Sequence, residues 1–159
     1  MSEDDKRIYR PIAEYALELG YTPKPVKTAG GISDEFAFSK SKVKRILLRM
    51  NPNEKHTGKA DLRLVFYATP QYSKPFRMGI KNVIEVFDGR YTGCYGCGRC
   101  KDGLEGYTYV YSDGKTVFRC GCELIRIPAM FTTDDVDENK TLMKTQDEFW
   151  LQKVISNPK

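Results

Sequence analysis

Residues 94–122, CYGCGRCKDGLEGYTYVYSDGKTVFRCGC, hold all five cysteines of the chain and its clearest hairpin signal. Two segments of alternating side chains, 107–111 and 116–120, flank the tetrapeptide SDGK. Asp-Gly between such segments is typical of a tight turn that joins two antiparallel strands. This hairpin brings the last two cysteines back beside the glycine-rich loop that carries the first three.

Around the hairpin, the sequence predicts helices and further strands. Apolar residues at helical spacing predict helices over 4–19 and 73–87, and a last helix that Thr132 or Thr133 caps. The Pro- and Gly-rich segment 21–32 is predicted to be a loop. The predicted strands are 35–38, 43–50, 62–68, 107–111, 116–120 and 123–127.

Because the strands come in runs separated by helices, the predicted fold class is α+β. We expect a single domain over residues 1–159, with one antiparallel sheet packed on one face by about three helices. A cysteine-rich zinc loop and its hairpin are expected at 92–122, within this domain.

The cysteine spacing is typical of a metal site. Three cysteines follow each other at C-x2-C spacing, and 19 residues later two more share one strand face. Thiolates bind zinc in a tetrahedron, and C-x2-C reaches one ion through a tight turn that glycine permits. We predict one structural zinc with the ligands Cys94, Cys97, Cys100 and Cys120. The set Cys97, Cys100, Cys120 and Cys122 stays open, because either Cys120 or Cys122 can supply the fourth sulfur.

An iron–sulfur cluster, a thiol redox site and the absence of a metal are the alternatives to zinc. The C-x2-C-x2-C-x3-C-P run of bacterial ferredoxins is missing from the sequence. A redox C-x-x-C motif opens a helix, whereas this segment is a glycine-rich loop. A closed four-cysteine zinc site has no position for water, so the metal is expected to be structural.

A basic stretch is the second candidate site. Its possible anion contacts are Lys42, Lys44, Arg45 and Arg49, in a chain of net charge +5. The favoured interpretation is a solvated sheet edge. The nucleic-acid hypothesis requires this stretch to share one face with Arg99 and Lys101 of the cysteine loop.

Tyr107, Tyr109 and Tyr111 lie on one face of a predicted strand and form the third candidate site. Tyrosines in such a row pack under a helix or line a ligand pocket. Our leading hypothesis is a non-enzymatic binding module for a small ligand or protein, with this face as its possible ligand surface. A nucleic-acid-binding zinc protein is the alternative, and an iron–sulfur or thiol redox protein a further one. The tyrosine hypothesis fails if these side chains are buried without an adjoining cavity.

The sequence favours a binding protein over an enzyme. His56 is the only histidine, so a nucleophile–His–acid triad is hard to assemble. The first ten residues lack the basic start and apolar stretch of a signal peptide. No apolar run approaches the ~20 residues of a membrane helix. We therefore expect a cytoplasmic protein without a membrane partner.

From the second predicted helix onward, the layout resembles the YdhG-like group of small α+β domains. The shared features are a helix that ends near a glycine, the strand Ile125-Arg126-Ile127-Pro128, and a terminal helix with an acidic start. The resemblance covers about half of the chain and implies an α+β fold. It carries over no functional residue, and the cysteine loop is an insertion relative to it.

Overall fold

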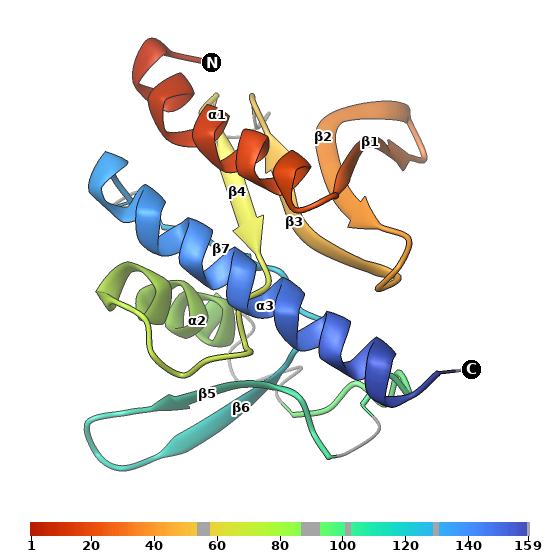
Figure 1. Cartoon of the computed structure of the whole chain (residues 1–159). Helices are drawn as coiled ribbons and strands as arrows, with labels where there is room; N and C mark the ends of the chain where they lie inside the picture. Colours follow the sequence, from red (N-terminus) through yellow and green to blue (C-terminus); the bar gives the residue numbers. More distant parts are fainter. Residues whose placement is uncertain (54–57, 87–92, 101–102, 129–130, 159) are drawn as a thin grey trace.

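The computed structural model describes residues 1–53, 58–86, 93–100, 103–128 and 131–158 (Figure 1). The elements are α1 (Glu3–Glu18), β1 (Thr22–Thr28), β2 (Gly31–Lys40), β3 (Arg45–Asn51), β4 (Asp61–Leu64), α2 (Lys74–Val86), β5 (Gly106–Val110), β6 (Thr116–Cys120), β7 (Ile125–Arg126), a 3-10 turn (Thr133–Asp135) and α3 (Val136–Ser156). No helix in this part of the chain combines the length and the apolar character needed to cross a bilayer.

The strands form two antiparallel sheets. The large sheet has the order β1-β2-β3-β4-β7, and β5 pairs only with β6. The α+β class is confirmed, and the prediction of a single sheet is wrong. The reason is that β7 pairs with β4, through Arg63 opposite Arg126 and Leu64 opposite Ile125, so the hairpin stays apart as a second sheet.

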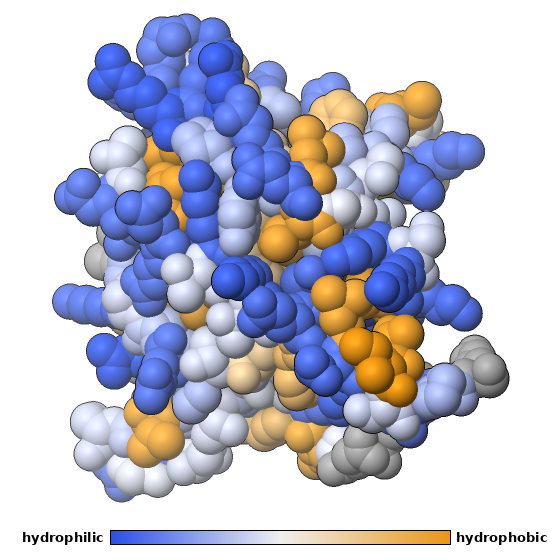
Figure 2. Space-filling model, viewed as in Figure 1, coloured by the Kyte–Doolittle hydropathy of each residue, from blue (hydrophilic) through white to orange (hydrophobic). Residues whose placement is uncertain are grey.

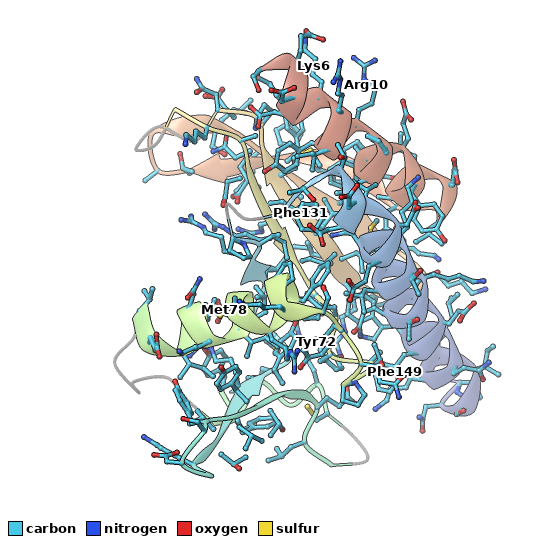
Figure 3. All side chains as sticks on the ribbon, turned by 90° about the vertical axis from the view of Figure 1, so that its left-hand side faces the viewer. Lys6, Arg10, Tyr72, Met78, Phe131 and Phe149 are labelled. Atoms are coloured by element: carbon cyan, nitrogen blue, oxygen red, sulfur yellow. The ribbon has the colours of Figure 1, made fainter. Side chains whose placement is uncertain are left out.

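The large sheet is apolar on one face and charged on the other. Alternate residues of paired strands lie on the same face, and Leu48 and Met50 of β3 pair with the buried Leu64 and Leu62 of β4. Figures 1 and 3 show α1 and α3 together on one side of this sheet. The other face carries a row of arginines, Arg49, Arg63 and Arg126, which are cross-strand neighbours.

Strand β1 lies where the sequence predicted a loop. Pro23 and Pro25 lower the strand propensity of this segment, but β1 is an edge strand that pairs only with β2. Proline is tolerated on an edge because the missing amide need not bond to a second neighbour. The loop expectation for 21–32 is therefore corrected to an edge strand and the start of β2.

Phe66 lies at the centre of the core, just beyond β4. Its ring packs edge-on against Tyr72, Phe76 and Tyr107 at centroid distances of 5.3, 5.4 and 5.2 Å. The backbone N–H of Phe66 donates to the hydroxyl of Tyr107 instead of to a strand. This contact explains why the predicted strand 62–68 ends early, at Leu64.

Helix α3 starts as the sequence predicted. Thr132 precedes the 3-10 turn, and both its N–H and its hydroxyl donate to the carboxylate of Asp135, at 2.8 and 3.1 Å. Trp150 of α3 is buried, as predicted, and its indole N–H donates to the hydroxyl of Tyr67.

A buried ion pair ties α3 to the large sheet. Lys40, at the end of β2, donates to both carboxylate oxygens of Asp147, at 2.8 and 2.9 Å. The hydroxyl of Tyr21 donates to the same carboxylate at 2.9 Å. Because both side chains of the ion pair are largely buried, each charge depends on the other for compensation.

Buried tyrosines predict a loss of stability at high pH. Burial, followed by the charges of Asp5 and Asp61, raises the pKa of Tyr9 to about 12, and burial also raises the pKa of Tyr21 and Tyr67. Below pH ~10 these hydroxyls are protonated in both the folded and the unfolded chain, so their contribution to the free energy of unfolding is fully present there. Above this pH the unfolded chain ionises first, so the free energy of unfolding should fall. Urea unfolding at a series of pH values above ~10 measures this fall in the free energy of unfolding. The fall should be smaller in Tyr9→Phe, which has no hydroxyl to ionise. A constant urea midpoint would contradict the prediction.

Candidate functional site

The cysteine loop lies against β6. The N–H of Gly93 donates to the carbonyl of Phe118 at 2.8 Å, and Gly93 forms a bridge with Arg119. The Glu123 carboxylate accepts from Arg119 at 2.8 Å and from the Tyr95 hydroxyl at 3.1 Å. The guanidinium of Arg119, only 1% exposed, also lies 5.3 Å from the centre of the Tyr95 ring. Polar contacts therefore join the loop to the end of the hairpin.

The structure pairs Cys97 with Cys122. Their sulfur atoms are 3.1 Å apart. Cys120 is buried. All five cysteines are free thiols in the structure. The fold thus brings cysteines of the loop and of the hairpin together, as the spacing predicted.

Backbone amides point at two loop sulfurs. The N–H of Gly96 donates to the sulfur of Cys94 at 3.3 Å, and a backbone hydrogen bond joins Arg99 to the sulfur of Cys97. Gly96 and Gly98 adopt φ values of 65° and 71°, a region that glycine enters without steric cost. The glycines that the sequence analysis singled out therefore allow the loop to turn its amides toward sulfur.

The two paired thiols differ in acidity. Burial, with the hydrogen bond to Cys97, raises the pKa of Cys122 to about 12. The hydrogen bond with Cys122, followed by that from the Arg99 backbone, lowers the pKa of Cys97. The pair therefore favours a thiolate on Cys97 and a proton on Cys122.

Among the residues that the structure describes, no group of three His, Cys, Asp or Glu side chains is arranged to hold a metal ion. The predicted zinc ligands therefore stay a prediction. Cys97 contacts Cys122, which belongs to the second predicted set. His56 lies outside the described residues.

Three neighbouring cavities near the cysteine loop share lining residues. The first, about 460 Å³, lies between the β2–β3 turn, the cysteine loop and Trp150. It shares Arg45 and Arg99 with a second cavity of about 310 Å³ near the end of α3. The first cavity also shares Arg49 and Cys122 with a third cavity of about 490 Å³. We call these three cavities together the cationic groove.

Basic side chains from separate parts of the chain line this groove. They are Lys40, Lys42, Lys44, Arg45, Arg49, Arg63, Arg99, Arg126 and Lys153. In Figure 1 the cysteine loop and the C-terminal end of α3 lie together at the lower right, and the β2–β3 turn lies above them on the same side. On the same view, Figure 2 shows a small apolar group amid hydrophilic residues near this end of α3.

Some basic residues of the groove form ion pairs with acidic side chains, and others do not. Glu35 and Asp61 form ion pairs with Arg49, Arg63 and Arg126 at 2.9–3.6 Å. Within the described parts of the chain, four other groove cations form no ion pair: Lys42, Lys44, Arg45 and Arg99. Their positive charge is therefore available to an anion.

All four predicted anion contacts line the groove, and Arg99 lies with them. The nucleic-acid hypothesis required this placement; Lys101, its other loop residue, lies outside the described residues. Arg63 and Arg126 could not be assigned to this site from the sequence, because their position depends on the pairing of β4 with β3 and β7.

The three tyrosines lie elsewhere. Tyr107 is 2% exposed, and its hydroxyl accepts from Phe66 N–H and donates to the carbonyl of Glu123. Tyr109 packs edge-on against Tyr111, whose hydroxyl donates to Glu85 of α2. The three cavities of the groove are lined by other residues. Tyr107 thus belongs to the core, and Tyr111 contacts a helix.

Lys44 has a strained backbone conformation within the groove. Its φ is 52°, which makes it the only non-glycine residue with positive φ in the described chain. Such a conformation costs an L-residue ~1–2 kcal/mol, and the extra unfolded-state entropy of glycine offsets ~0.5–1 kcal/mol of this. We expect Lys44→Gly to raise the free energy of unfolding by up to ~1 kcal/mol.

Urea unfolding measures this change, and Lys42→Gly is the matched control, because Lys42 lies in the same turn and has no positive φ. The control should show no gain. Loss of stability in Lys44→Gly would contradict the argument from strain.

Comparison of the chain with protein-family models, curated proteins and solved structures finds no match. The resemblance to the YdhG-like group therefore stays a prediction. The case for a function rests on the geometry of the groove and of the cysteine cluster.

Proposed function

We propose that this chain is a non-enzymatic binding module for single-stranded nucleic acid, which it holds in the cationic groove. The observation that carries the proposal is the meeting of Arg99, from the cysteine loop, with Lys44 and Arg45, from the β2–β3 turn, in one cavity. A phosphate backbone binds to basic side chains that are not already paired with acidic side chains.

The shape of the groove supports an extended ligand. Each cavity, at 310–490 Å³, has the volume of a small-ligand site. The first cavity shares lining residues with each of the other two, from which we infer that the three form one row. A linear polyanion occupies such a row, whereas a small ligand occupies one cavity. A flexible single strand follows the row more readily than a duplex does.

Phosphate contacts should dominate the affinity. Trp150, the aromatic residue that lines two of the cavities, is buried and offers little surface for base stacking. The bound strand should therefore show little sequence preference. With four uncompensated cations and a slope of −0.7 per contact, log affinity should fall with log salt at a slope of about −3.

Fluorescence anisotropy with labelled single-stranded DNA and RNA, over a series of salt concentrations, tests the proposal. Arg45→Glu should weaken binding at least ~fourfold near physiological salt and make the slope shallower by ~0.7 or more. Arg10→Glu is the control, because it makes the same charge change on α1, and Figure 3 shows Arg10 on the upper side of that helix, at the top of the molecule.

The proposal is overturned if no strand binds, if a duplex of the same sequence binds more tightly, or if the two substitutions have equal effects. Equal effects would mean that net charge, and not the groove, attracts the nucleic acid.

A further inference from the structure

We propose that Cys97, Cys100, Cys120 and Cys122 bind one zinc ion, and that Cys94 is not a ligand. This ligand set differs from the one that cysteine spacing alone favours. The inference does not depend on the occupant of the cationic groove, because its tests measure metal and thiol chemistry only.

One pair of sulfur atoms is close to the spacing of a zinc site. Zinc–sulfur bonds of ~2.3 Å in a tetrahedron place two sulfur atoms ~3.8 Å apart. The sulfurs of Cys97 and Cys122 are 3.1 Å apart. An increase of ~0.7 Å in this distance would give the two sulfur atoms the spacing of two ligands of one zinc ion. Cys120, buried at the end of β6 and two residues before Cys122, supplies the third sulfur.

The fourth sulfur comes from the cysteine loop, where two residues compete. Cys94 and Cys100 both lie three positions from Cys97, so spacing does not separate them. Burial does: Cys100 is half-buried, as Cys122 is, whereas Cys94 is exposed. A closed structural site surrounds its metal with protein, which favours Cys100.

The surroundings hold the two ligand-bearing segments in place. Glu123 follows Cys122 and accepts from Arg119, beside Cys120, and from Tyr95 of the loop. Such outer contacts orient the ligands of a metal site.

The first test is metal analysis of protein purified without added metal, together with five Cys→Ser variants. We expect about one zinc per chain in the wild type and in Cys94→Ser. Each of the other four variants should lose more zinc affinity than the ~10- to 100-fold that loss of an outer contact costs. Zinc retained by Cys122→Ser and lost by Cys94→Ser would overturn the proposed ligand set.

The second test uses the wild-type chain, since a substitution of the buried Cys120 can unfold the protein. Alkylation of the zinc-loaded chain, followed by mass spectrometry, should modify Cys94 quickly and the other four cysteines only after a chelator is added. Fast modification of all five cysteines with zinc present would overturn the site. So would iron with sulfide, or a Cys97–Cys122 disulfide that forms in air in a chain that takes up no zinc.

Discussion

Asp147→Ala is expected to lower the free energy of unfolding by ~3–5 kcal/mol. The substitution leaves the Lys40 ammonium buried without its carboxylate and removes the acceptor of the Tyr21 hydroxyl. An uncompensated charge of this kind costs more than the ion pair contributes, because desolvation of Lys40 is no longer offset. Urea unfolding of the variant, followed by circular dichroism, measures the loss.

Two further variants separate the buried charge from other causes. Glu148→Ala changes the neighbouring, exposed acidic residue of α3 and should alter stability by no more than ~0.5 kcal/mol. Lys40→Met combined with Asp147→Leu removes both charges and should recover most of the lost stability. If the double variant were as unstable as Asp147→Ala, the cost would come from packing and not from the unpaired ammonium.

Phe66→Ala is expected to lower the free energy of unfolding by ~3–5 kcal/mol. Phe66 is fully buried, and its ring contacts three other aromatic rings that come from two other parts of the chain, the start of α2 and β5. The cavity left by the ring cannot close unless Phe76 on α2 and Tyr107 on β5 both move. The loss should therefore fall near the upper end of this range.

Phe36→Ala is the matched control, because it removes the same ring from a position that is 38% exposed. Its cost should be a fraction of that of Phe66→Ala. Similar urea midpoints for the two variants would show that Phe66 does not organise the core.

The hairpin and the helices could be predicted because their signals are local. Asp113-Gly114 lies between two alternating segments, and the structure has strands on both sides of it. The apolar stripe of α2 and the capping threonine of α3 are also visible in a short window of sequence. Their predicted bounds differ from the observed ones by one or a few residues.

The features that the sequence did not predict depend on contacts between distant residues. The Phe66 amide leaves β4 because Tyr107, far along the chain, offers an acceptor. Lys40 looks like one more surface lysine until Asp147 of α3 is placed beside it. In the candidate site, the spacing predicted that loop and hairpin cysteines meet, but the choice of Cys122 over Cys120 as the partner of Cys97 needed coordinates.

The two prolines of β1 also affect how the molecule meets its own copies. An open sheet edge with a full row of amides is a template on which another chain adds a strand, the first step toward aggregation. Pro23 and Pro25 carry no N–H, and β1 ends the sheet on that side. A strand that approached this edge would find no N–H donor at two alternate positions. The residues that hide β1 from a sequence-based prediction thus protect the folded chain from edge-to-edge self-association.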